Sequence, residues 1–271
     1  MTKEELRRDL EALGVRPGDL LMVHASLRKL GLGRADVGHG GAERLLEALE
    51  AAVGPGGTLL MVLGTDYPMD WVNERPTGGR AALLAGAAPF DHRNAPVLSE
   101  VGWLAEAFRR RPGTLVSANP SGRFGARGAL AGDLLAGQPW HDYYGPGSPL
   151  EKFCGRGGRI LRLGANRDTV TALHYAEYVA DLPEKRRTRW DYVVAGADGT
   201  PEHVRIDCLD DLNGIADWDG EDYFAAILTA YLALGRHREG LVGKAQSELI
   251  DAADMVRFGA RWMEENLAPP A

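Results

Sequence analysis

Residues 41–63 read GAERLLEALEAAVGPGGTLLMVL, and this stretch decides the expected fold. Its first half is amphipathic, because apolar residues recur three and four positions apart, as Leu45, Leu49 and Val53 do, and this spacing predicts a helix over 41–53. The Gly-Pro-Gly-Gly run at 54–57 ends that helix. The apolar run at 58–63 then predicts a buried strand. A helix joined to a buried strand by a short turn is the repeating unit of α/β folds.

The same alternation continues on both sides of this unit. Thr2 and Glu5 form a capping-box pattern that opens a first helix, which Gly14 is expected to end. Ser148 precedes a proline at the first helical position and a glutamate three residues on, which again predicts a helix start. Thr169 is expected to cap the helix that carries His174. Further strands are predicted at 20–24, 114–117 and 159–163, and further helices at 99–110, 169–180, 221–234 and 247–266.

Two segments depart from this alternation. Residues 189–195 and 202–208 flank an Ala-Asp-Gly-Thr turn, which is a hairpin signature, so we expect a small antiparallel excursion near 186–210. Residues 66–93 show no clean period and are rich in proline, glycine and aromatic residues. A connection of that length inside a compact domain is usually functional. No internal repeat divides the sequence, and we expect a single α/β domain over residues 1–271.

The composition is that of a globular protein with an acidic balance. The 271 residues include 31 Lys and Arg against 38 Asp and Glu, a net charge of −7, which disfavours nucleic acid as a partner. Apolar runs such as 59–63 are too short to cross a bilayer, and the first residues lack an apolar signal segment. A cytoplasmic protein with no membrane partner is therefore expected. Cys154 and Cys208 lack metal-ligand spacing, and no metal is expected.

The residues that could carry chemistry include a histidine and a glutamate on one predicted helix. His174 and Glu177 lie three positions apart, so they share a helix face. A carboxylate beside an imidazole can fix its tautomer and stabilise the cation that forms when it takes a proton. The spacing alone is equally compatible with a histidine that packs without a catalytic role and a glutamate exposed to solvent. The His-Ala-Ser-Leu turn at 24–27 similarly fits either a phosphate-binding turn or a plain one.

Charge is unevenly distributed near the predicted hairpin. Residues 207–222 hold seven carboxylates and no lysine or arginine. They fit a wall that attracts a polycationic substrate, or a solvated acidic loop. The basic run at 185–187, with Arg189, fits solvated charges at a strand edge or a phosphate contact.

Six short motifs occur in an order that resembles one known family. They are His24-Ala25-Ser26-Leu27, Gly54-Pro55-Gly56-Gly57-Thr58, Pro89-Phe90-Asp91, Gly145-Pro146-Gly147-Ser148-Pro149, Leu173-His174-Tyr175-Ala176-Glu177 and Ala180-Asp181-Leu182-Pro183. Together they resemble the aminoglycoside 3-N-acetyltransferases, a family of antibiotic-resistance enzymes. The resemblance runs from about residue 3 to residue 266.

This resemblance implies an α/β/α sandwich of the family's own type, distinct from GNAT acetyltransferases. It implies direct transfer of the acetyl group of acetyl-CoA to the 3-amino group of a 2-deoxystreptamine ring. It makes His174 the general base, with Glu177 and Asp211 as further catalytic residues. The residues implied on the cofactor side are Ser26, Leu27, Arg28, Ser117 and Thr169. The family's Ser-x-His-Pro stretch reads Ser-Ala-Asn-Pro at 117–120 here, so any role of a histidine at Asn119 is lost.

Aminoglycosides are polycationic sugars, so acidic and aromatic side chains are the expected substrate contacts. The residues expected to bind the substrate are Asp66, Tyr67, Asp91, Asp142 and Asp210. Either Asp210 or Asp211 is expected to support the histidine, and the sequence leaves that choice open. Two other functions stay open as well: acetylation of a different amine on the same fold, and sequestration of cationic antibiotics without catalysis. A monomer and a dimer are both compatible with the sequence.

Overall fold

The computed structural model describes residues 1–32, 40–196, 198–220 and 222–267 of the chain. Its main sheet has the strand order β3–β4–β2–β1–β5–β9–β8. The centre of the sheet is parallel and is formed by β1 (Leu20–Ala25), β2 (Thr58–Val62) and β5 (Arg159–Leu163). The outer strands join antiparallel to their neighbours: β3 (Leu115–Val116), β4 (Phe124–Gly128), β8 (Arg238–Val242) and β9 (Ala245–Asp251).

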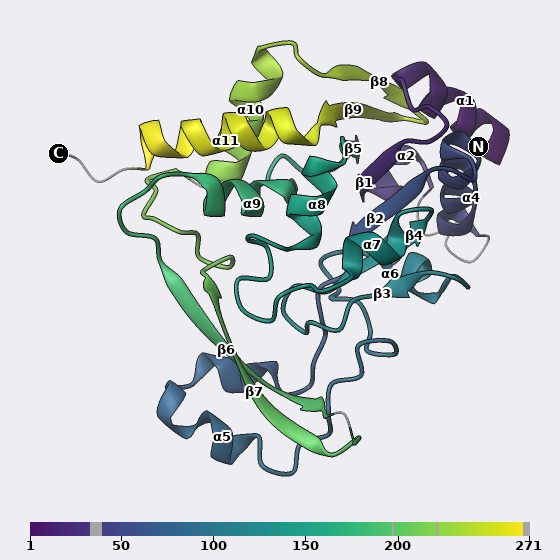
Figure 1. The fold of residues 1–271 in the computed structure, drawn as a ribbon. Helices are drawn as coiled ribbons and strands as arrows, with labels where there is room; N and C mark the ends of the chain where they lie inside the picture. The colour runs from purple at the N-terminus through teal and green to yellow at the C-terminus, as the bar shows by residue number, and fades with distance from the viewer. Residues whose placement is uncertain (33–39, 197, 221, 268–271) are drawn as a thin grey trace.

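Helices cover both faces of this sheet. Successive residues of a strand point to opposite faces, so in β1 Leu21 and Val23 join one hydrophobic core while Met22 joins the other. On the first side lie α1 (Lys3–Leu13), α4 (Gly41–Val53) and α6 (Trp103–Arg110). On the second side lie α7 (Ala131–Leu135), α8 (Pro149–Gly155), α9 (Ala172–Val179), α10 (Tyr223–Ala233) and α11 (Ala252–Asn266) (Figure 1). The expected α/β/α sandwich is confirmed.

The antiparallel excursion is a two-stranded hairpin that projects from the body of the molecule (Figure 1). Its strands, β6 (Arg187–Ala195) and β7 (Pro201–Leu209), pair along their whole length. Beside the hairpin lies the long connection at 66–93, which holds the short helices η1 (Asp70–Glu74), η2 (Thr77–Gly79) and α5 (Arg80–Leu83). A bridge between Phe90 and Val194 joins the two segments. Ala197, in the predicted turn, lies outside the described residues.

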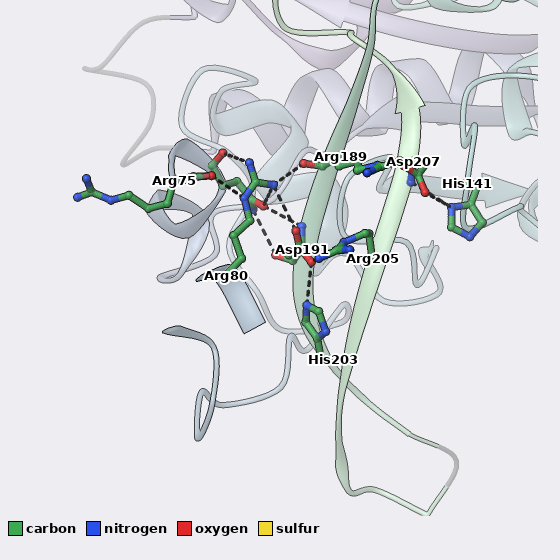
Figure 2. A network of polar contacts seen from close by, with 9 residues as sticks. Arg75, Arg80, His141, Arg189, Asp191, His203, Arg205 and Asp207 are labelled. Atoms are coloured by element: carbon green, nitrogen blue, oxygen red, sulfur yellow. Dashed lines mark hydrogen bonds and ion pairs between the residues drawn. The ribbon is translucent and has the colours of Figure 1, made fainter. Parts of the chain in front are cut away.

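A buried polar network fastens the hairpin to that connection (Figure 2). Asp191 is fully buried, and its Oδ2 lies 3.2 Å from Nη1 of Arg80 on α5. Its Oδ1 lies 2.8 Å from Nε2 of His203 and 3.1 Å from Nε of Arg205, both on β7. Its backbone N–H donates to Oδ1 of Asn73 at 2.7 Å. A buried carboxylate needs such partners, because burying an unpaired charge is strongly unfavourable.

Local signals in the sequence set several boundaries correctly. Helix α4 spans the predicted residues, and α1 has the predicted capping box, with Glu5 N–H donating to Thr2. Gly14 ends α1 in the left-handed conformation, with φ 113°. Ser148 caps α8, and Pro149 is its first residue. These are positions where one side chain decides the backbone conformation.

Other expectations were wrong. The predicted helix 247–266 begins only at Ala252, because the preceding residues form β9 against β5. Strands β4 and β8 were not predicted. Helix α6 begins at Trp103 rather than 99, and α10 begins at Tyr223, while Glu221 lies outside the described residues. Thr169 does not cap α9: the cap position is Thr171, and the Thr169 hydroxyl donates to Asp168 instead.

Candidate active site

His174 and Glu177 form a hydrogen-bonded pair on α9, which follows the carboxyl end of β5. Nδ1 of His174 lies 2.8 Å from Oε2 of Glu177. The glutamate side chain is 1% exposed and the histidine side chain is 20% exposed. An ionised carboxylate only accepts hydrogen bonds, so Nδ1 carries the hydrogen. The other ring nitrogen, Nε2, is then left with a lone pair that can accept a proton.

Aromatic residues hold this pair in place. The ring of Tyr144 stacks on His174 at 5.0 Å and 14°, and Phe224 meets the imidazole edge-on at 4.8 Å. The hydroxyl of Tyr223 donates to the second oxygen of Glu177 and accepts from the backbone N–H of Ile215 at 3.2 Å. Both carboxylate oxygens therefore have partners, and the imidazole is confined between two rings.

The pair lines a cavity of about 490 Å³, called here the His174 cavity. Carboxylates dominate the charged groups around it: Asp168, Glu177, Asp211, Asp217 and Asp222, against the single cation Arg186 in the described part of the wall. Burial disfavours the protonated imidazole, but Glu177, Asp211 and Asp222 outweigh burial and raise the pKa of His174. For Asp211, burial disfavours the charged carboxylate and raises its pKa, although the charge of His174 opposes that rise.

The two neighbouring aspartates occupy different places. Asp211 lines the His174 cavity, and its Oδ2 accepts from the hydroxyl of Tyr143 at 2.7 Å. Asp210 is buried, and its Oδ1 accepts the backbone N–H groups of Leu212 and Asn213 at 3.2 and 2.9 Å. The fold therefore brings Asp211 to the histidine and uses Asp210 to shape the turn. A contact of Asp210 with substrate stays a prediction.

A second cavity, the Ser26 cavity, has a volume of about 710 Å³. Ser26, Leu27 and Arg28 line it where β1 passes into the short helix α2 (Leu27–Leu30), and Thr169 lines it from the loop after β5. Four of the five residues predicted on the cofactor side thus share one cavity. Asp168 lines the His174 cavity and the next residue, Thr169, lines the Ser26 cavity, so this loop contributes to both cavities.

The fifth cofactor-side residue lies apart from the others. Ser117 is buried beside β3, lines a different cavity, and its Oγ accepts from the backbone N–H of Phe124 at 2.9 Å. Asn119 braces the same region. Its amide donates to the carbonyls of Pro139 and Trp140, while its Oδ1 accepts two backbone N–H groups, those of Ser121 and Gly122. A cofactor contact of Ser117 remains a prediction without geometric support here.

The predicted substrate residues do not all meet at the histidine. Asp66, Tyr67 and Asp91 line a separate cavity of about 500 Å³, the Tyr67 cavity. Tyr67 is itself buried, with its ring against Phe90 and Tyr192. Asp91 accepts the backbone N–H groups of the turn that follows it. Asp142 accepts from Tyr178 and Arg187 at 3.1 and 2.7 Å, next to the hairpin. Their contacts with substrate stay predictions.

Sequence reasoning missed the aromatic residues of the site. Tyr143 and Tyr144 directly precede the Gly-Pro-Gly motif at 145–147, and Tyr223 and Phe224 begin α10. Nothing in their spacing connects them with His174, because the contacts depend on long-range packing. Among the described residues, no group of three or more His, Cys, Asp and Glu side chains could hold a metal ion. No helix of the described chain is long and apolar enough to cross a membrane.

Comparisons with known proteins agree on one family. The family model described as aminoglycoside 3-N-acetyltransferase matches residues 22–264. The chain is 40% identical to aminoglycoside N(3)-acetyltransferase III of Serratia marcescens, over 99% of both chains. It is 38% identical to aminoglycoside N(3)-acetyltransferase VII of Streptomyces paromomycinus, over 98% of this chain and 93% of the relative.

Solved structures are similar over the same length. The crystal structure of the aminoglycoside acetyltransferase AAC(3)-Xa superposes with a TM-score of 0.90 at 40% identity, covering 99% of this chain and 94% of the other. A binary complex of AAC-IIIb with CoASH gives 0.89 at 38% identity, covering 100% and 99%. AAC-VIa bound to sisomicin gives 0.87 at 38%, covering 99% of each chain. The chain therefore belongs to the aminoglycoside 3-N-acetyltransferase family and is an acyltransferase.

Proposed function

We propose that this enzyme transfers the acetyl group of acetyl-CoA to the 3-amino group of the 2-deoxystreptamine ring of aminoglycosides, with His174 as general base, and so confers resistance. The observation that carries the proposal is the His174–Glu177 pair, which lines an acid-walled cavity. One loop lines both this cavity, through Asp168, and the Ser26 cavity, through Thr169. The similar AAC-IIIb and AAC-VIa structures contain CoASH and sisomicin, respectively. That agrees with one cavity for each substrate.

The chemistry follows from the state of the imidazole. An ammonium group has no lone pair, so the substrate amine must lose a proton before it can attack the thioester carbonyl. With Nδ1 donating to Glu177, Nε2 of His174 is the acceptor for that proton. The new C–N bond forms as the C–S bond breaks, and the leaving thiolate takes a proton to give CoA. General-base help of this kind typically contributes about 10² to 10⁴ in rate.

The surrounding charges support the same role. When His174 becomes an imidazolium, Glu177 and Asp211 stabilise it, which is why they raise its pKa. The remaining carboxylates of the cavity suit a substrate with several ammonium groups, because a cleft lined by one sign of charge concentrates the opposite ion. We assign Asp211, rather than Asp210, to the support of the histidine, since only Asp211 lines the cavity.

A thiol-release assay with acetyl-CoA and a panel of aminoglycosides tests this function. We expect CoA release that depends on the aminoglycoside, and NMR of the product should show one new acetamide, at the 3-amino group. Expression in a susceptible bacterium should raise the inhibitory concentration of the same compounds. Binding of aminoglycosides without CoA release would instead indicate sequestration. A mixture of 3-, 2′- and 6′-acetylated products would mean that another amine is the natural substrate.

A further inference from the structure

The hydroxyl of Tyr223 lies between the His174–Glu177 pair and the turn that carries Asp211. It donates to Oε1 of Glu177, the oxygen that His174 does not contact, and it accepts from the backbone N–H of Ile215 at 3.2 Å. The tyrosine is 8% exposed, so little solvent reaches it. One buried hydroxyl therefore contacts both the carboxylate that orients the imidazole and the acidic wall of the cavity.

Residues 210–217 form this part of the wall and are called here the acidic turn. From the side of the hairpin, the backbone N–H of Arg186 donates to the carbonyl of Ile215 at 2.7 Å. The guanidinium of Arg186 donates to two further carbonyls of the same turn at 3.1 and 3.0 Å. From the side of α10, Tyr223 accepts from the N–H of Ile215. The acidic turn is thus held at one residue by groups from two different elements.

Packing fixes the ring of Tyr223 independently of its hydroxyl. Gly214 has positive φ, 78°, and a Cβ there would lie 2.7 Å from Cε1 of the tyrosine. The ring also meets Phe224 edge-on at 5.1 Å, and Phe224 in turn contacts the imidazole of His174. A phenylalanine at position 223 would keep the ring in this place and remove only the hydroxyl.

Charged groups from several elements lie around the pair. Glu177, Asp211 and Asp222 raise the pKa of His174, and Glu177 also acts on the half-buried ammonium of Lys185. The remaining charged residues in the described lining of the His174 cavity are Asp168, Arg186 and Asp217. Within the described chain, only the side chains of His174 and Tyr223 form hydrogen bonds with the Glu177 carboxylate. The hydroxyl therefore acts directly on the charge that the imidazole meets.

We propose that Tyr223 is a positioning residue for acetyl transfer, whose hydroxyl holds Glu177 against His174 and ties the acidic turn to the same carboxylate. The inference rests on the proposed role of His174 as general base. A donor stabilises a carboxylate most when no neighbouring cation neutralises it. The hydroxyl therefore stabilises the pair more before the imidazole takes a proton than afterwards. This leaves a larger fraction of His174 unprotonated, and so able to act as a base, at a given pH.

Tyr223→Phe tests this role through the acid limb of the pH profile of kcat/KM for an aminoglycoside. That limb should move to higher pH by roughly half a unit, because the carboxylate without its donor attracts a proton to the pair more strongly. The maximal kcat should fall roughly tenfold, the size of a charge-assisted hydrogen bond. CoA affinity, measured by calorimetry, should be unchanged. Glu177→Gln removes the charge itself and should move the limb the opposite way, to lower pH.

The matched control is Tyr231→Phe, the same substitution on the same helix. Tyr231 is fully buried, and its hydroxyl also donates to a carboxylate, Oδ2 of Asp254, at 2.9 Å. It lies outside the described lining of the His174 cavity. The control should therefore lose stability in the same way and keep the wild-type acid limb and kcat. In a Glu177→Gln background, Tyr223→Phe should no longer move the limb, because the proposed effect passes through the carboxylate.

An acid limb that stays in place in Tyr223→Phe would overturn the proposal, and so would a shift that persists in the Glu177→Gln background or appears equally in Tyr231→Phe. NMR titration of the His174 imidazole makes the same comparison without turnover, and its pKa should rise in Tyr223→Phe but not in Tyr231→Phe. Failure of the proposed function has a different signature, because then the wild-type protein would release no CoA with any aminoglycoside.

Discussion

At the scale of single residues, the two ring nitrogens of His174 have different roles. Nδ1 is committed to Glu177, and two aromatic rings fix the plane of the imidazole. Only Nε2 is available to a substrate. The pair is therefore ordered before any substrate binds, and removing the imidazole removes the base without removing the walls of the cavity.

His174→Ala should abolish turnover and leave acetyl-CoA affinity within a few-fold of the wild type. Loss of a general base should lower kcat by about 10² or more. Steady-state kinetics, together with calorimetric CoA binding, measure the two effects separately. A variant that keeps even a tenth of the wild-type kcat would remove His174 from the role of base.

The pH dependence should report the raised pKa of His174. A base works only when neutral, so kcat/KM should fall as the pH drops through a pKa above the ordinary value of 6.5. Glu177→Gln removes a carboxylate that raises this pKa, so the acid limb should move to lower pH while the maximal rate falls. An acid limb that stays in place in the Gln variant would mean that a different group titrates.

The two adjacent aspartates give a matched pair of variants. Asp211→Asn removes a charge from the His174 cavity, and we expect the aminoglycoside KM to rise or kcat to fall by roughly tenfold, the size of a charge-assisted hydrogen bond. Asp210→Asn keeps an oxygen for the turn N–H groups and should leave the kinetics nearly unchanged. If steady-state assays give the two variants the same kinetic defect, the cavity lining does not separate their roles.

At the scale of elements, the hairpin β6–β7 depends on one buried carboxylate. Asp191 joins both strands of the hairpin to α5 through Arg80, His203 and Arg205 (Figure 2). Arg80 is itself buried and also donates to the carbonyls of Asn73 and Arg189. These groups come from segments more than a hundred residues apart in the chain, so the network holds the long connection at 66–93 against the hairpin.

Asp191→Ala should lower the free energy of unfolding by about 3 kcal/mol, because it leaves a buried guanidinium without its charged partner. Chemical denaturation measures this loss, and limited proteolysis should show earlier cleavage in 66–93. Glu202→Ala is the control: it removes an exposed carboxylate from β7 of the same hairpin and should change stability by no more than about 0.5 kcal/mol. Equal stability of the two variants would show that the network contributes little.

Elements with strong local signals could be predicted from the sequence, and elements that depend on distant partners could not. Helix α4 has an apolar face and a glycine turn at its end, and the structure keeps its predicted bounds. Residues 247–251 were assigned to the start of the last predicted helix. Pairing with β5 makes them part of the strand β9. Strand β4 contains glycines and an arginine, and only its pairing with β2 identifies it.

The same distinction between local signals and distant partners applies to the candidate site. The spacing of His174 and Glu177 placed both on one helix face, and the hydrogen bond between them follows from that spacing. The sequence could not show which carboxylates of residues 207–222 have partners, because those partners lie elsewhere in the chain. Arg189 pairs with Asp207, and Arg186 pairs with Asp217. Asp222 caps α10. Only the packing of the hairpin shows which carboxylates are left to face His174.

At the scale of the whole molecule, consecutive residues of one loop belong to two different cavities: Asp168 to the His174 cavity and Thr169 to the Ser26 cavity. In the proposed direct transfer, the donor and the acceptor react with no protein nucleophile carrying the acetyl group between them. Both must then be bound before either product leaves. Initial-rate measurements should therefore give double-reciprocal lines that intersect, whereas parallel lines would reveal an acetylated enzyme. On this proposal, the kinetic order of turnover would follow from where two neighbouring positions of the chain are placed.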